Sequence, residues 1–232
     1  WVIGEFVWTG FNYLGEPTPY DEYWPSRSSY FGISDLAGLP KDRYYLYRSR
    51  WNTTDETLHI LPHWNWEGRE GQNTPVFVYT NYNSAELFLN GVSQGVRSKT
   101  KNGTPQERYR LMWMDVKYQP GTLKVIAFNE DGQPAAQKTI TTSGKAKQII
   151  LEPNVKTLKA NGEDLAFVTV SVVDDNGIPC PTASHQLQFS VEGAGQFRAA
   201  CNGDPTSLAL FHKPTMQLFN GQLVVIVSSS KT

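Results

Sequence analysis

The chain has 232 residues, enough for one or two domains or three small ones. Its 21 Lys and Arg residues nearly balance 22 Asp and Glu residues, and the net charge of −1 gives no electrostatic reason to expect a nucleic acid or an anionic membrane as partner. No apolar run approaches the roughly 20 residues that span a bilayer, and no signal peptide is recognisable, which leaves the compartment open.

The first 51 residues are rich in aromatic side chains and irregular in pattern. Residues 1–8, WVIGEFVW, predict a short strand buried on both faces, and a long loop follows to residue 38. Residues 38–51 predict a helix, with Pro40 near its first turn and Asp42 at the positive end of its dipole. One βα unit cannot bury both of its faces by itself, so we expect it to pack against other parts of the protein.

From about residue 55 the pattern changes to short alternating segments separated by turn dipeptides such as Asn-Gly and Asp-Gly. This spacing is typical of an antiparallel β-sandwich. The predicted strands are 74–81, 85–91, 108–118, 121–129 and 136–142.

A polar linker at 142–147 leads to a second β-rich stretch, which predicts a second Ig-like sandwich. Its predicted strands are 147–153, 163–177, 185–193, 195–200 and 221–230. The last of them either leaves an open edge, as in a domain cropped at its C-terminus, or pairs with an earlier strand. Asp175-Asn176-Gly177 indicates a tight turn.

The expected fold is therefore mainly β, with two Ig-like antiparallel β-sandwich domains preceded by a βα unit. We expect the boundaries at 1–54 for the βα unit, 55–143 for the first sandwich and 144–232 for the second.

Several carboxylates lie close in sequence to tryptophans, a combination that suggests glycoside hydrolysis by paired carboxyl groups. They are Glu5, Glu16, Asp21 and Glu22. Strand parity places Glu5 on the opposite face from Trp8, and the other three fall in a Pro-rich loop where turn-capping or solvated roles are usual. We assign none of them a catalytic role.

Other candidate sites are weaker. His63, His185 and His212 lack ligand spacing, so we predict no metal and no cofactor. Cys180 and Cys201 allow one disulfide, but two separate thiols are the favoured interpretation.

Two further sequence patterns allow more than one interpretation. Trp64 and Trp66, in HWNWEG, could form a sugar-stacking platform, although packing in a sandwich is favoured for such large rings. Asn52 and Asn102 begin glycosylation sequons, a weak signal that depends on the host.

Taken in order, several stretches resemble the C-terminal part of a bacterial glycoside hydrolase of family 2, the β-galactosidase family. They are GEFVWTGFNYLGEP, WPSRSSYFGISDLAGLPKDRYYLYRSRW, LPHWNWEG, VFVYTNYNSAELFLNG, NGEDLAFVTVSVVDDNG and CNGDPTS. Together they extend over nearly the whole chain.

The resemblance implies that 1–54 is the last strand, loop and helix of a TIM barrel, in which catalysis takes place at the C-terminal ends of the strands. It implies a retaining, exo-acting glycosidase whose two catalytic glutamates lie upstream of this chain, so that the chain alone is inactive. It also implies that Trp8 lines the sugar pocket, and it suggests a periplasmic or secreted location. Asn12 departs from the family's usual Asp.

The alternative from another functional class is a non-catalytic carbohydrate-binding or adhesive module that uses Trp64 and Trp66. The isolated βα unit favours the enzyme, because a free-standing binding module has no use for it. On the enzyme reading, carbohydrate is the partner, through the parent protein.

A βα unit without barrel neighbours should expose apolar surface, so residues 1–51 are expected to pack on the first sandwich or on a second copy of the chain. We therefore predict self-association at micromolar concentrations. Sedimentation velocity across a concentration series measures it, and a strictly monomeric profile would count against it.

Overall fold

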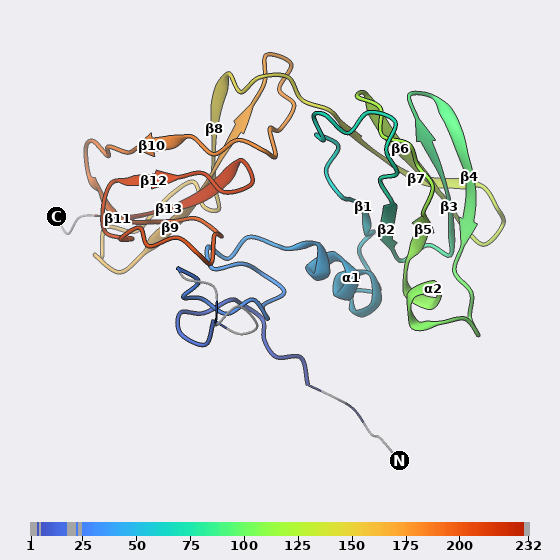
Figure 1. The fold of residues 1–232 in the computed structure, drawn as a ribbon. Helices are drawn as coiled ribbons and strands as arrows, with labels where there is room; N and C mark the ends of the chain where they lie inside the picture. The colour runs from blue at the N-terminus through green and yellow to red at the C-terminus, as the bar shows by residue number, and fades with distance from the viewer. Residues whose placement is uncertain (1–3, 5, 18–21, 23–24, 230–232) are drawn as a thin grey trace. The chain divides into compact units, whose positions relative to one another are not determined.

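The computed structural model describes residue 4, residues 6–17, residue 22 and residues 25–229. Contacts divide the chain into two compact units (Figure 1). Residues 41–142 form one of them, and residues 1–40 together with 143–232 form the other. The first predicted domain, 1–54, is thus divided between the units near residue 40. Each unit is described separately below.

The unit at 41–142 is a helix followed by a two-layer β-sandwich. One sheet has the order β1-β2-β5 and the other β4-β3-β6-β7, and all pairs are antiparallel. The elements are α1 Asp42–Trp51, β1 Leu58–Leu61, β2 Val76–Thr80, β3 Ser84–Leu89, β4 Val92–Ser98, α2 Pro105–Tyr109, β5 Leu111–Trp113, β6 Thr122–Phe128 and β7 Pro134–Thr141. The prediction of a first sandwich is confirmed.

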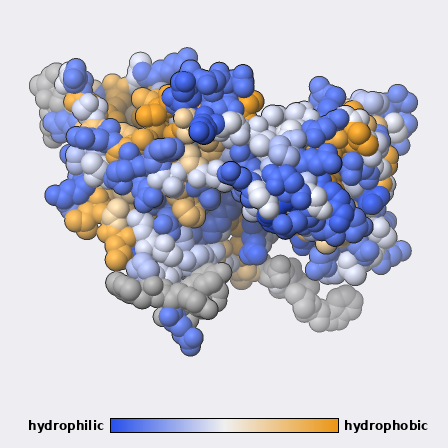
Figure 2. All heavy atoms as spheres, turned by 45° about the horizontal axis from the view of Figure 1, so that its top comes forward, coloured by the Kyte–Doolittle hydropathy of each residue, from blue (hydrophilic) through white to orange (hydrophobic). Residues whose placement is uncertain are grey.

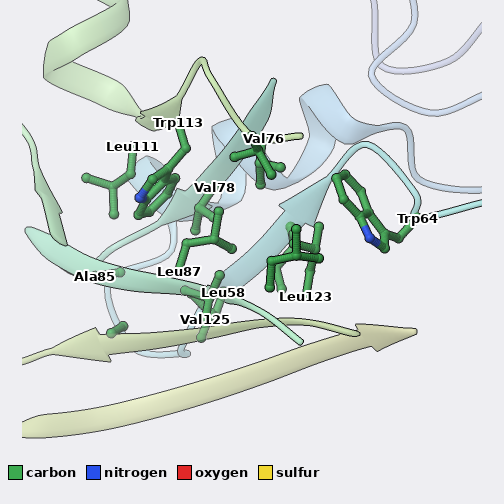
Figure 3. Close-up of a cluster of buried hydrophobic side chains, with 14 of the residues drawn as sticks. Leu58, Trp64, Val76, Val78, Ala85, Leu87, Leu111, Trp113, Leu123 and Val125 are labelled. Carbon is green, nitrogen blue, oxygen red and sulfur yellow. The ribbon is translucent and has the colours of Figure 1, made fainter. Parts of the chain in front are cut away.

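Alternating side chains from both sheets fill the space between the layers (Figure 3). In β3, Ala85, Leu87 and Leu89 are buried while the residues between them are half-exposed, as a period of two requires. Two large rings close the core, since Trp64 and Trp113 are each only 1% exposed. Their indole N–H groups are satisfied by backbone carbonyls, of Gln119 at 2.9 Å and Gly95 at 2.8 Å respectively.

The predicted strand at 108–118 is only partly correct, because helix α2 ends within it and β5 is three residues long. The helix begins with a capping box: the Thr104 hydroxyl accepts from the Glu107 backbone N–H, and the Glu107 carboxylate accepts from the Thr104 backbone N–H at 2.7 Å. The sequence pattern also missed β1 and β4, because β1 has only four residues and β4 is mostly polar.

The β-rich part of the other unit begins at residue 143. Its larger sheet has the order β11-β13-β9-β8, and a two-stranded sheet pairs β10 with β12, all antiparallel. The strands are β8 Gln148–Pro153, β9 Leu165–Val173, β10 Gln186–Gln188, β11 Gly195–Cys201, β12 Thr215–Gln217 and β13 Gln222–Ser229. We call this part, 143–232, the C-terminal domain.

Strand β13 is not an open edge. It pairs with β9 on one side and β11 on the other, so the second of the two alternatives for the last strand is correct. Its core position explains the apolar run LVVIV, because a central strand is covered on both faces. The Asp175-Asn176-Gly177 turn also forms, with the Asp174 carboxylate accepting from the N–H groups of Asn176 and Ile178.

Two strands of the large sheet of the C-terminal domain carry exposed apolar side chains. Ile149 and Leu151 on β8 and Leu165 and Phe167 on β9 are all more than 40% exposed. Hydrophobic residues are visible among the polar ones on the molecular surface (Figure 2).

The predicted N-terminal strand is not formed by the residues that the structure describes. Residues 1–3 and Glu5 lie outside them, and residue 4 and residues 6–8 have no ladder partner among the strands of the described chain. Phe6 is fully exposed and Trp8 is 71% exposed, so the expectation of burial on both faces is wrong for these positions. A strand depends on neighbouring strands for its hydrogen bonds, and the described part of the chain supplies none beside residues 6–8.

The packing of the first 51 residues follows the expectation only for the helix. Helix α1 contacts β1 and β2 of the first sandwich, whereas the loop before it bonds to the C-terminal domain. Phe6, Trp8 and Phe11 are exposed, as self-association through this segment requires, and self-association stays a prediction.

The two environments of tryptophan in the 41–142 unit allow a matched stability test. Trp64→Ala should lower the free energy of unfolding by about 3–5 kcal/mol, because it empties a closed core site. Trp51→Ala, at a 65% exposed ring, should change it by less than about 1 kcal/mol. Urea denaturation followed by far-ultraviolet circular dichroism measures both, and equal losses would contradict the assignment of Trp64 to the core.

Candidate functional site

Trp8, the residue predicted to line a sugar pocket, presents an open aromatic face. Its indole Nε1 donates a hydrogen bond to the Tyr13 hydroxyl at 3.1 Å, and the two rings meet edge to face with centroids 6.4 Å apart. The Tyr13 hydroxyl in turn donates to the Glu16 carboxylate. The chain of bonds holds the edge of the indole and leaves much of its surface available to a ligand.

The Tyr13 phenol remains a donor at neutral pH. Its hydrogen bond to Glu16 raises its pKa above the ordinary value, the bond from Trp8 opposes this, and a small desolvation effect adds to it. The Glu16 carboxylate is thus the acceptor that orients the Tyr13 hydroxyl.

The segment that follows Trp8 is fixed by backbone pairing with residues 27–34. Five backbone N–H groups donate to carbonyl oxygens across the pair at 2.8–3.1 Å. They are Ile33 to Thr9, Ser34 to Gly10, Asn12 to Ser34, Ser29 to Tyr13 and Gly15 to Arg27. We call residues 9–15 and 27–34 the paired loop. Although it contains no regular strand, it is tied along its whole length.

Asn12 has a structural role within the paired loop. The residue is buried, and its Oδ1 accepts from the Gly32 backbone N–H at 3.0 Å. Gly32 is required here, because a Cβ atom at this position would lie 2.2 Å from the Asn12 backbone nitrogen. The amide oxygen supplies the same kind of acceptor as the carboxylate of the Asp that the resemblance leads one to expect.

The paired loop is anchored on the C-terminal domain through Arg27. Its backbone N–H donates to Pro205 O at 3.2 Å, and its Nη2 donates to Ala209 O at 3.1 Å. Its guanidinium carbon lies 5.6 Å from the centre of the Phe211 ring, a distance typical of a cation–π contact.

A second point of the same contact joins Asp35 to Gly203. The Asp35 side chain lies so close to the Gly203 backbone that a Cβ atom at Gly203 would lie 1.9 Å from the Asp35 Oδ2. The other oxygen, Oδ1, accepts from the N–H groups of Ala37 and Leu39 at 2.9 and 2.8 Å. Gly203 is thus the residue that lets the loop dock on the domain.

Cys201 lies near this contact and is not a reactive thiol. Burial, with a smaller contribution from the charge of Asp35, raises its pKa to about 12, and Arg27 only partly opposes the shift. Both cysteines are free, which confirms the prediction of two separate thiols.

The remaining candidate residues do not join this site. Glu5 and Asp21 lie outside the described residues, and Glu22 is exposed. His63 stacks on Trp66 with ring centroids 4.4 Å apart, and burial lowers its pKa. Within the residues that the structure describes, no three His, Cys, Asp or Glu side chains are grouped as metal ligands, and no helix is long and apolar enough to cross a membrane.

Trp64 and Trp66 do not form the exposed sugar-stacking platform of the alternative function. Trp64 is buried in the first sandwich, and Trp66 is half-buried, with its Nε1 bonded to His63 O at 2.8 Å and Arg69 over its ring. The packing interpretation of Trp64 is confirmed.

Sequence reasoning missed Tyr13, Arg27 and Gly203. Tyr13 lies close to Trp8 in the sequence, so the pairing of their side chains could have been predicted. The bond from Arg27 to Ala209 joins residues 182 positions apart, and nothing in either local stretch announces it.

Two family profiles match the chain. Residues 149–232 match the glycoside hydrolase family 2 C-terminal domain 5, and residues 71–136 match a domain of unknown function, DUF4982. The first covers most of the C-terminal domain and the second lies within the first sandwich.

Curated relatives are longer than this chain. A β-galactosidase of Bacteroides ovatus is 46% identical over 229 residues, which are 98% of this chain and 26% of the relative. A putative β-glucuronidase of Formosa agariphila is 33% identical over 208 residues, 88% of this chain and 19% of the relative. The chain therefore spans about a quarter or less of the length of these relatives.

Solved structures share the fold. A β-glycosidase from Bacteroides vulgatus is 35% identical with a TM-score of 0.88, covering 100% of this chain and 28% of the other. A glycosyl hydrolase family 2 member from Bacteroides cellulosilyticus is 29% identical with a TM-score of 0.88, covering 100% of this chain and 33% of the other.

The anchor on the C-terminal domain can be tested by removing the guanidinium. Arg27→Ala should make the amides of the paired loop exchange faster, because the bond to Ala209 and the contact with Phe211 stabilise docking by roughly 1–3 kcal/mol. Hydrogen exchange read by mass spectrometry on peptides covering 9–15 and 27–34 measures the effect. Arg198→Ala, at an exposed position of β11, is the control, and unchanged exchange in Arg27→Ala would contradict the anchor.

Proposed function

Because this chain belongs to the C-terminal region of glycoside hydrolase family 2, we propose that it works as part of a retaining, exo-acting glycosidase with a β-galactosidase-like activity. The catalytic glutamates belong to an upstream part of the parent protein, within the barrel of which residues 1–54 are the final segment. This chain supplies one wall of the sugar pocket and the domain that supports it. The names of the relatives, a β-galactosidase and putative β-glucuronidases, support a glycoside as substrate.

The observation that carries the proposal is the open face of Trp8 on an anchored loop. An aromatic ring can stack on the apolar face of a sugar, and stacking is useful to an enzyme only if the ring is held in place. Tyr13 fixes the edge of the indole, and the paired loop fixes its backbone.

The C-terminal domain has a function in this arrangement. Arg27 and Asp35 join the paired loop to residues 203–211, so a domain remote from the chemistry holds the sugar-binding wall. A displacement of about 1 Å in a substrate-positioning group can lower a rate by about a hundredfold.

The hydrogen bonding of the carboxylate near Trp8, Glu16, favours a structural role for it over a catalytic one. Retention requires two carboxyl groups about 5–5.5 Å apart on either side of the scissile bond. Glu16, which reaches Trp8 through Tyr13, accepts a hydrogen bond from a phenol and serves to position the rings.

The buried position of Trp64 removes the observation that favoured a carbohydrate-binding or adhesive module as the alternative. We therefore keep one function for the chain.

The test compares the chain with its full-length parent on 4-nitrophenyl β-galactoside and β-glucuronide. The chain alone should show no turnover above background, because it lacks the catalytic pair. In the parent, Trp8→Ala should lower kcat/KM by about 10- to 100-fold, and Trp8→Phe should restore part of the loss because it keeps a stacking face.

Two results would overturn the proposal. One is turnover by the chain alone that disappears in Glu5→Gln, which would place a catalytic carboxylate here. The other is an unchanged kcat/KM in the Trp8→Ala parent. Trp64→Phe is a control for folding, since it alters a buried ring in another part of the chain.

A further inference from the structure

The first sandwich contains a cavity of about 630 Å³ that is separate from the Trp8 site. It lies where the end of α1, the loop after β4, the short helix α2 and the turn after β6 come together, and every residue that lines it belongs to the 41–142 unit. The volume is in the range of small-ligand sites.

Four cations line the cavity against a single carboxylate. They are Arg50, Lys99, Lys101 and Arg108, and the carboxylate is Glu130. Among the described residues, none of the four cations forms an ion pair within 4 Å, whereas ion pairs do form elsewhere, as between Arg48 and Asp55. The chain is nearly neutral overall, so the cavity is more positive than the chain as a whole.

The environment of Lys99 disfavours its charged form. Its Nζ is mostly buried and donates to the Thr80 backbone carbonyl at 2.5 Å. Burial and, to a smaller extent, the positive charge of Arg50 lower its pKa to about 8. A bound anion would relieve this repulsion, because an opposite charge favours the protonated lysine.

The rest of the lining suits a sugar. Neutral hydrogen-bonding groups come from Asn83, Ser84, Ser98 and Asn129, which can donate to and accept from hydroxyl groups. Tyr109 adds a partly exposed aromatic ring, 5.3 Å from the Arg50 guanidinium carbon and 5.4 Å from that of Arg108.

The lining is held in place by backbone bonds. Lys99 N donates to Asn83 O at 2.8 Å, which joins the end of β4 to the turn before β3. Thr100 N donates to Glu107 O at 3.0 Å, and the capping box fixes the first turn of the helix that carries Arg108 and Tyr109. The backbone segments that carry Lys99, Arg108 and Tyr109 are therefore fixed around the cavity.

We propose that this cavity is an accessory binding site for an anionic saccharide, one whose carboxylate or sulfate is held by Arg50, Lys99 and Arg108 while its ring lies against Tyr109. The site does not depend on the proposed function, since it is formed entirely by the first sandwich. Two other occupants share part of the chemistry: a free inorganic anion, which would not use Tyr109 or the amide and hydroxyl groups, and an acidic peptide segment.

Isothermal titration of the 232-residue chain tests the site with matched probes. Cellobiuronic acid and cellobiose differ only in that the first carries a carboxylate on one sugar, and cellobiose 6-sulfate carries a sulfate in its place. We expect either anionic disaccharide to bind at least tenfold more tightly than cellobiose. We also expect it to bind more tightly than inorganic phosphate, with an affinity that falls as salt is raised. Because no turnover is measured, failure here would leave the proposed function untouched.

Two variants locate the binding. Arg108→Ala should weaken cellobiuronic acid binding by about tenfold through loss of a charged hydrogen-bond donor, and Tyr109→Ala should weaken it while leaving phosphate binding unchanged. Lys138→Ala, which removes an exposed cation of β7 outside the cavity, is the matched control. Circular dichroism confirms that each variant folds.

The pH dependence gives an independent readout. Binding should weaken as the pH rises above about 8, because Lys99 of the free protein then loses its charge. A bound anion raises the pKa of Lys99, so in the complex the lysine loses its charge at a higher pH. The proposal is overturned if cellobiose binds as tightly as its acid or if phosphate binds as tightly as either anionic disaccharide. Tighter binding of hexaglutamate than of the saccharides, or an unchanged affinity in Arg108→Ala, would also overturn it.

Discussion

The docking of the paired loop on the C-terminal domain is the contact on which the N-terminal part of the chain depends. Residues 9–15 and 27–34 contain no regular strand, and their backbone groups bond to each other, to side chains of the same loop and, at Arg27, to the domain. Arg27 carries much of this contact through two hydrogen bonds and the ring of Phe211. Because Gly203 has no side chain, Asp35 can approach the domain backbone. If either residue changed, the loop that presents Trp8 would lose its support.

The first sandwich is organised by a different constraint, the burial of large apolar rings between two sheets. Trp64 and Trp113 are enclosed, and each satisfies its N–H group on a backbone carbonyl, so neither leaves a buried polar atom unpaired. The same unit keeps a cationic cavity at its surface. Its charges are placed by secondary-structure ends, at α1, β4 and α2, where loops can orient side chains outward from a rigid core.

The two parts of the chain thus suggest complementary roles in a larger glycosidase. In the proposed function, the loop and the C-terminal domain form and support one wall of the sugar pocket at Trp8, and in the further proposal the first sandwich binds a charged sugar. Both sites include an exposed aromatic ring, Trp8 in one and Tyr109 in the other. They differ in charge: the Trp8 site is formed by neutral rings and one carboxylate, and the cavity by four cations.

That Trp8 lines a sugar pocket stays a prediction. From local alternation, turn residues and a recognisable order of motifs, the sequence alone predicts the β-rich character, most of the long strands and the helix near Asp42. It could not reveal the short β1, the helix α2 hidden in an apolar run, or the exposure of residues 6–8, since these depend on capping and on the strands available for pairing. The contact of Arg27 with Ala209 and the gathering of four separated cations around one cavity depend on the tertiary fold. Contacts between residues far apart in the chain leave no periodic trace in either partner.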